Sequence, residues 1–226
     1  MAEKAMVLAG VCGSYTGARE IGVALERAAS EANLIGPATV AALPLGCEVA
    51  ISAVKLAPLE RLPNSNKLGS VDAYDVGFGR YALSRPANDK LCNAAGVQTI
   101  ESTMLSFETR YCAFRSTVGV RRFDGSMQRA TATRVIDLRE GSQYLANLRE
   151  AARSRNKPID GQGNEILAAL AAHAETKARL RAARALLQVR TYTADEMTKP
   201  FVCASIMFTG RCPNNPDLER ANMAMI

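Results

Sequence analysis

The feature that most constrains this chain is a run of small apolar residues between positions 164 and 190. They recur at every third or fourth position, the spacing that places side chains on one face of an α-helix. Lys177, Arg179, Arg181 and Arg184 lie on the opposite face. The pattern therefore predicts a helix over 164–190 that packs closely against protein along a narrow stripe. The stripe consists of Leu167, Leu170, Ala171, Ala174, Ala178, Ala182, Ala185 and Val189.

Three other segments, 16–34, 86–115 and 140–155, carry a helical pattern of apolar residues. Alanine, the strongest helix former, supplies about one residue in six. Residues 116–138 are less regular and favour short strands or extended arms, and the tail from Lys199 is rich in loop-forming residues. Helices therefore dominate the predicted secondary structure.

The same pattern sets the expected fold. Gly79-Arg80 and Gly210-Arg211 each precede a helical pattern that starts at a proline and has an early aspartate, which suggests two pseudo-repeated helical units. A second apolar run extends over 39–57 and is broken by Pro44. We predict a mainly α fold in which long extended loops or arms join the helices of a single linker-type unit, 1–226. The expected sub-units are 1–120 and 121–226.

An excess of basic residues points to an acidic partner. The chain has 28 Lys+Arg against 22 Asp+Glu, a net charge of +6, and arginine outnumbers lysine 21 to 7. Arginine suits planar, bidentate contact with carboxylates or phosphates. Nucleic acid, an anionic membrane surface and an acidic protein all fit this charge. No run of eighteen apolar residues occurs, so no membrane insertion is expected.

The residue types that enzymes need are scarce. The chain has a single histidine, His173, in an alanine-rich segment, and its six cysteines form no CxxC pair, so neither a histidine-assisted nucleophile nor a structural metal site is expected. There is no Walker A, HExxH or EF-hand sequence. Gly10 to Gly17 resembles the turn of a dinucleotide site, but its spacing is not GxGxxG. The sequence therefore predicts a protein that is not an enzyme.

Several cysteines have cations and carboxylates nearby in sequence. Cys92 follows Asp89 by three residues and Arg85 by seven, so one helix face can hold all three. Cys112 lies between Arg110 and Arg115. A neighbouring cation favours the nucleophilic thiolate. Such a set suits a covalently carried tetrapyrrole, with a thioether to cysteine, a carboxylate that accepts from the pyrrole N–H groups, and arginine paired with a propionate. A buried cysteine under a solvated helix face is the simpler alternative.

Two segments resemble the red-algal phycoerythrin gamma subunits, the chromophore-carrying rod linkers of the phycobilisome. They are Gly79-Arg80-Tyr81 through Cys92, and Glu101-Ser102-Thr103-Met104 leading into Thr109-Arg110-Tyr111-Cys112. The basic charge, the absence of Trp and the scattered cysteines add to the likeness.

The resemblance implies a light-harvesting linker in the plastid, at the stromal face of the thylakoid membrane. Its partners would be the acidic hexameric rings of phycoerythrin alpha and beta subunits and other phycobilisome linkers, with no nucleic acid. Its cofactors would be phycoerythrobilin or phycourobilin on cysteine. The role passes first to Cys92 and Cys112, with Asp89, Arg85, Arg110 and Arg115 as the accompanying charged groups. It passes next to Cys47, Cys203 and Cys212.

Two other classes stay open. One is a basic RNA-associated or ribosomal-type protein, which the arginine count favours and the low aromatic content disfavours. The other is a small nucleotide-binding oxidoreductase that uses the Gly10–Gly17 loop. A visible absorption spectrum separates the three, because bilins absorb in the green, flavins absorb in the blue, and a nucleic-acid binder absorbs in neither.

Overall fold

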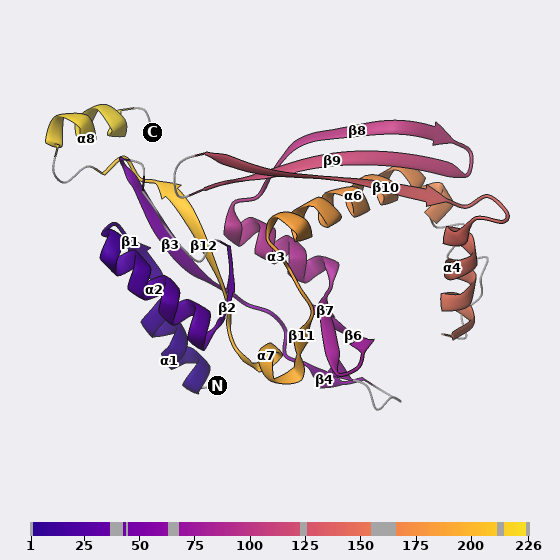
Figure 1. Ribbon diagram of the computed structural model, residues 1–226, viewed down its shortest axis with the longest axis horizontal. Helices are drawn as coiled ribbons and strands as arrows, with labels where there is room; N and C mark the ends of the chain where they lie inside the picture. The colour runs from indigo at the N-terminus through magenta and orange to yellow at the C-terminus, as the bar shows by residue number, and fades with distance from the viewer. Residues whose placement is uncertain are drawn as a thin grey trace. The chain divides into compact units, whose positions relative to one another are not determined.

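The computed structural model is a mixed α/β fold, about 40% helix and 37% strand, so the prediction of a mainly α fold is wrong (Figure 1). The chain divides into two compact units. Unit 1 comprises Met1–Gln98, Val120–Gln128 and Leu186–Ile226, and unit 2 comprises Thr99–Gly119 and Arg129–Ala185. The structure describes residues 2–36, 43, 45–62, 68–122, 126–154, 166–211 and 215–224.

Among the described residues, unit 1 contains five helices and nine strands. Its helices are α1 (Ala2–Val11), α2 (Ala18–Glu31), α3 (Arg85–Ala95), α7 (Ala194–Thr198) and α8 (Pro216–Met223). Its strands are β1 (Gly13–Tyr15), β2 (Asn33–Ile35), β3 (Cys47–Val54), β4 (Glu60–Arg61), β5 (Leu68–Gly69), β6 (Ala73–Gly77), β7 (Arg80–Leu83), β11 (Tyr192–Thr193) and β12 (Phe201–Phe208).

The main sheet of unit 1 has the strand order β1-β3-β12-β2. β12 pairs antiparallel with β3 along eight residues and parallel with β2 along three. Both central strands are apolar along most of their length, as expected of strands covered on two faces. All of β3 lies in the apolar run at 39–57, whereas β12 lies in the tail that was expected to be loop.

Helices cover both faces of this sheet. On one face, Ile21 and Leu25 of α2 pack against Val49 of β3 and Val202 of β12. On the other face, the buried residues of α3 share a cluster with strand residues that include Cys203. The helix predicted at 16–34 is therefore confirmed as α2, and its apolar stripe is the buried one.

A fully buried aspartate ties α3 to the strands below it. Asp72 accepts hydrogen bonds from the backbone N–H of Ala57 at 2.7 Å and from Nζ of Lys90 at 2.6 Å. Asn88, also buried, donates to the carbonyl groups of Leu83 and Ser84. These contacts fix the start of α3 on the three-stranded sheet β11-β7-β6.

Unit 2 is a three-stranded antiparallel sheet with helices on one side (Figure 1). The strand order is β10-β9-β8, and α6 lies along one face of the sheet. Cys112 and Ile136 from the sheet share a buried cluster with Leu145 of α4 and with Leu170 and Ala174 of α6. The elements are β8 (Gln98–Glu108), β9 (Tyr111–Arg121), β10 (Met127–Asp137), α4 (Gln143–Ser154) and α6 (Leu170–Leu186).

The Ala stripe is confirmed. Leu170, Ala174, Ala178 and Ala182 of α6 are all buried, although Ala185 is exposed. The helix predicted at 140–155 is confirmed as α4.

The long helix predicted at 86–115 is wrong, and Gly96 explains why. Gly96 adopts the left-handed conformation at φ 68°, and the backbone N–H of Val97 bonds to the carbonyl of Cys92 at 2.9 Å. This is a helix-terminating motif in which glycine avoids the steric penalty of a side chain. The chain then continues as β8 and β9. The division expected after residue 120 falls inside β9.

Candidate binding surface

Among the described residues, one face of the unit 2 sheet carries no helix. Two cross-strand hydrogen bonds show which side chains lie on which face. The Ser102 and Ser116 hydroxyls are 2.9 Å apart, and Ser116 is buried on the side of Cys112 and α6. The Thr117 and Thr131 hydroxyls, also 2.9 Å apart, lie on the opposite side. Since strand residues alternate between faces, this opposite side, called the outer face below, includes Glu101, Thr103, Leu105, Phe107, Arg115, Thr117, Arg129, Thr131, Thr133 and Val135.

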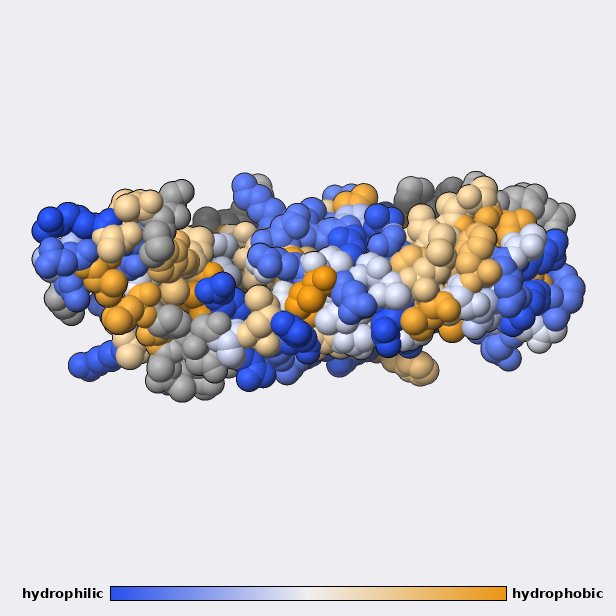
Figure 2. Space-filling model, turned by 90° about the horizontal axis from the view of Figure 1, so that it is seen from above, coloured by the Kyte–Doolittle hydropathy of each residue, from blue (hydrophilic) through white to orange (hydrophobic). Residues whose placement is uncertain are grey.

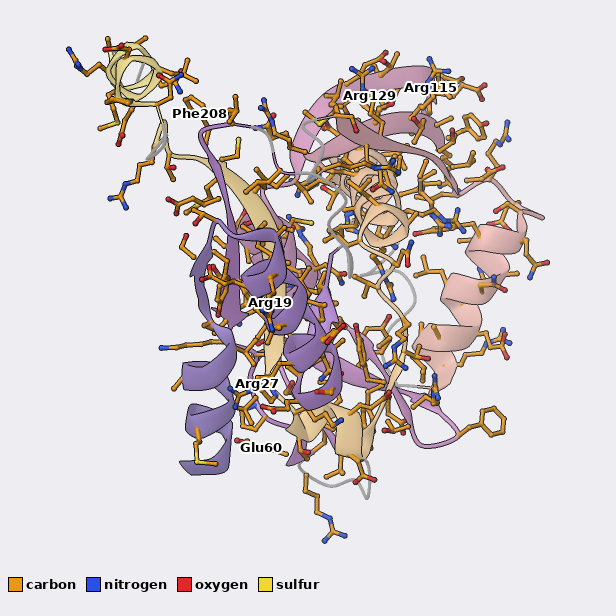
Figure 3. All side chains as sticks on the ribbon, turned by 60° about the vertical axis from the view of Figure 1, so that its left-hand side comes forward. Arg19, Arg27, Glu60, Arg115, Arg129 and Phe208 are labelled. Atoms are coloured by element: carbon orange, nitrogen blue, oxygen red, sulfur yellow. The ribbon has the colours of Figure 1, made fainter. Side chains whose placement is uncertain are left out.

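Two arginines on the outer face are exposed and available. Arg115 and Arg129 make no ion pair with any residue in the described part of the chain. In Figure 3 both lie on the side of the sheet that is away from α6. The pairing of Thr117 with Thr131 places them on either side of that threonine pair. Two guanidinium groups can therefore reach carboxylates or phosphates of a partner without first breaking a contact.

The same face has an apolar end. Leu105 and Phe107 of β8 are 47% and 58% exposed, and Val135 of β10 is 41% exposed. Ala113 of the middle strand lies in the same alternating set and is buried. Figure 2 views the molecule from above Figure 1 and shows apolar side chains gathered toward the right of the view, with hydrophilic ones beside them. Arginine together with exposed apolar side chains is typical of protein–protein interfaces.

Arg139, at this end of the sheet, contacts Tyr111 and Asp137. The Arg139 guanidinium lies 4.5 Å from the centre of the Tyr111 ring and donates to both carboxylate oxygens of Asp137, at 2.9 and 2.8 Å. Its hydrogen bond lowers the pKa of Asp137, and the same contact raises the pKa of Arg139. Arg139 is therefore already occupied, unlike Arg115 and Arg129.

The cysteine cluster predicted around Cys112 does not form. A helix would place Cys112 and Arg115 on one face, but in a strand two residues three apart point to opposite sides. Cys112 is fully buried toward the helices, which raises the pKa of its thiol, while Arg115 lies on the outer face. Arg110 is exposed in the turn between β8 and β9, and its charge contributes to the lowered pKa of Glu140 after the main effect of Arg149.

The cluster predicted on α3 is present as a shared helix face. Arg85 and Asp89 form an ion pair, with Nε and Oδ2 3.6 Å apart, and Cys92 lies one turn further along. Cys92 is half-buried and packs against the core cluster that contains Cys203. The three residues therefore share the surface of one helix, although the carboxylate is already paired with the arginine.

The remaining predicted cysteines offer less access. Cys47 and Cys203 are buried. Burial, with a smaller effect of the nearby Cys92, raises the pKa of Cys203 to about 12. Cys212 lies outside the described residues. The burial of Cys47, Cys112 and Cys203 does not support attachment of a large chromophore to any of them in this conformation.

The segment around Gly10 is not a dinucleotide turn. A dinucleotide site requires a strand before its glycine-rich turn, but α1 occupies Ala2–Val11. The guanidinium of Arg27 instead fills the space beside Gly10, where it donates to the Gly10 carbonyl at 3.2 Å. The oxidoreductase alternative therefore lacks its structural basis.

Sequence reasoning missed most of the outer face. It assigned Thr131 and Thr133 to a strand or arm without a role, and it gave Arg129 none. The available signal was the alternation of β10, in which threonine, threonine and valine occupy every second position from 131 to 135. Tyr144 was placed in the helix at 140–155, but its cation contacts were not predicted: the ring has Arg134 at 5.4 Å and Lys177 at 5.8 Å from its centre.

Comparison of the chain with models of known families, with curated proteins and with solved structures found no match. In the part of the chain that the structure describes, no three His, Cys, Asp or Glu residues are arranged to hold a metal ion. No described helix is long and apolar enough to cross a membrane.

Proposed function

We propose that this chain is a non-catalytic assembly protein that binds an acidic protein surface through the outer face of its β8-β9-β10 sheet. The observation that carries the proposal is the combination of Arg115 and Arg129, unpaired within the described residues, with the exposed Leu105, Phe107 and Val135. The arginines supply charge complementarity and the apolar side chains supply area to bury.

An acidic protein fits this face better than a nucleic acid does. Proteins that bind single-stranded nucleic acids present rows of aromatic side chains on which the bases stack. On the outer face, the strands offer a single exposed aromatic ring among the described residues, that of Phe107. Aliphatic Leu105 and Val135 have no counterpart on a phosphate backbone. The partner that the phycoerythrin gamma resemblance suggests, an acidic phycobiliprotein ring on the stromal side of the thylakoid, has the required charge.

The binding test uses isolated phycoerythrin hexamers as the probe. We expect the full chain to bind them, and the double variant Arg115→Glu/Arg129→Glu to bind at least roughly tenfold more weakly. The matched control is Arg19→Glu/Arg220→Glu, which makes the same change in net charge on exposed residues of α2 and α8 (Figure 3 labels Arg19). If both double variants weaken binding equally, net charge and not the outer face is responsible.

The salt response adds a second readout. Binding carried by exposed charges weakens as the Debye length falls from about 10 Å at 0.1 M to about 3 Å at 1 M salt. A polyuridine strand measured in parallel tests the nucleic-acid alternative. Tighter binding to polyuridine than to phycoerythrin, with loss in the Arg115→Glu/Arg129→Glu variant, would contradict the acidic-protein proposal and favour the RNA-associated class.

A bilin on Cys92 is the chromophore part of the proposal. What supports it is that Cys92 is half-buried on the same helix face as Asp89 and Arg85, whereas Cys47, Cys112 and Cys203 are buried. We expect the chain isolated from its source to absorb in the green and to carry one tetrapyrrole mass that Cys92→Ser removes. Cys12→Ser, at the other half-buried cysteine among those that the structure describes, is the control. Unmodified thiols at every cysteine would remove the chromophore and leave the binding proposal to its own test.

A further inference from the structure

The edge strand β8 is unusually open. It is eleven residues long, and none of its residues is buried. It pairs with β9 on one side only, so every second residue directs its backbone N–H and C=O away from the sheet. Within the described residues no helix or strand pairs with this free side. An open row of backbone donors and acceptors is a template for another strand.

β8 also lacks the devices that keep edge strands apart. Residues 98–108 contain no lysine, arginine or proline. Instead they present Ile100, Met104, Leu105 and Phe107, each at least 42% exposed. The opposite edge strand, β10, is different, because Arg129 and Arg134 both lie on it. The two edges of this sheet are therefore not equivalent, and β8 is the edge that favours pairing with a strand of another chain.

From these observations we infer that two copies of this chain pair through β8, antiparallel and in register about Thr103, to form one continuous six-stranded sheet. Residues opposite each other in an antiparallel pair share a face, so a two-fold axis at Thr103 keeps outer-face residues opposite outer-face residues. This register uses all eleven residues of the strand. It leaves the outer face open and so does not depend on the proposed acidic partner.

The side chains fit this register. Gln98 of one copy lies opposite Glu108 of the other, where an amide N–H can donate to the carboxylate. Glu101 lies opposite Leu105, so like charges do not face each other. Thr99 lies opposite Phe107 and Ile100 opposite Ser106. The only charges on β8 are the carboxylates of Glu101 and Glu108, which would repel the acidic partner from this edge.

The test is the oligomeric state of the full chain by sedimentation velocity over a range of concentrations. We expect a dimer whose dissociation constant rises roughly tenfold or more in Thr103→Lys, because two ammonium groups then face each other across the axis. Thr133→Lys, on the outer face of β10, is the matched control and should leave the dimer unchanged. Leu105→Lys tests the register, because its ammonium lies opposite Glu101 of the other copy and should preserve the dimer.

A covalent probe tests the same pairing independently of stability. In this register the two copies of residue 103 lie within about 5.5 Å at Cα, a separation that a disulfide can span. Thr103→Cys should therefore form a 103–103 disulfide, identified by peptide mass, and Thr133→Cys should not. A chain that stays monomeric at all concentrations, or a Thr103→Lys variant that dimerises as well as Thr133→Lys does, would overturn the inference.

Discussion

Among the described elements, the main sheet of unit 1 and the sheet of unit 2 differ in the number of faces that helices cover. The central strands of the unit 1 sheet, β3 and β12, have helices on both faces and are apolar along most of their length. In the part of the chain that the structure describes, the unit 2 sheet has helices on one face only, and β10 alternates threonine and valine on the open side with buried or half-buried residues on the other. The number of covered faces is thus reflected in the strand sequence. A strand covered on both faces is a continuous apolar run, and a strand covered on one face alternates with a period of two residues.

The strongest test of this comparison is a substitution near the start of β12. Val202 is fully buried between the helix layers, so Val202→Asp should place an unpaired carboxyl in an apolar core. We expect a loss of about 4 kcal/mol or more in the free energy of unfolding, measured by urea denaturation. Thr133→Asp on the open face of β10 should cost less than about 0.5 kcal/mol. Equal losses in the two variants would show that the outer face is covered in the folded chain.

A finer test compares two neighbours in one strand. Ile136 is fully buried against the helices of unit 2, whereas Val135 is 41% exposed on the outer face. Ile136→Ala should lower the free energy of unfolding by about 3 kcal/mol, because it removes buried methyl groups and leaves a cavity. Val135→Ala should change it by about 0.5 kcal/mol or less. A reversed order would mean that the strand presents its other face to the core.

The smallest effect compares one carboxylate from each unit. Glu196 accepts from the backbone N–H of Thr193 at 2.8 Å in the capping box of α7, and this hydrogen bond, with the nearby Arg190, lowers its pKa. Glu140 makes a bidentate pair with Arg149, which also lowers its pKa, but the pair is solvent-exposed. Glu196→Gln should therefore lower the free energy of unfolding at pH 7 by about 0.5 kcal/mol, and Glu140→Gln should lower it by less.

The pH dependence gives the sign of that effect. A carboxyl group whose pKa is lower in the folded state stabilises the fold above its unfolded pKa, near 4.3, and this contribution is lost as the pH falls through the folded pKa. The difference in urea midpoint between wild type and Glu196→Gln should accordingly be present at pH 7 and shrink below about pH 4. A pH-independent difference would mean that shape, not charge, carries the capping contact.

The spacing of apolar residues within a segment predicted several helices of this fold. Elements that depend on partners far away in the sequence were not predicted. The helices α2, α4 and α6 follow from spacing alone, and the buried Ala174 and Ala178 confirm the stripe. The extension of α3 past Ala95 failed because the left-handed Gly96 stops the helix, after which alternation replaces helical spacing. β12 was missed because its partners, β3 and β2, lie about 150 residues or more earlier in the chain.

The candidate site residues likewise fall into those that local spacing could predict and those that it could not. The shared face of Arg85, Asp89 and Cys92 could be predicted, since a helix places residues three and four apart together. The Cys112 cluster could not, because its residues lie in a strand and its neighbours Arg110 and Arg115 are placed in a turn and on the opposite face. The outer face depends on a pairing, Thr117 with Thr131, that no single segment reveals.

The position of β12 has a consequence for synthesis on the ribosome. The strand lies between β3 and β2, so the main sheet of unit 1 cannot close until translation has passed residue 208. Unit 2, by contrast, draws its sheet and helices from residues between 99 and 185, which emerge earlier. The middle of the nascent chain can therefore fold while β2 and one edge of β3 remain unpaired until β12 has been synthesised.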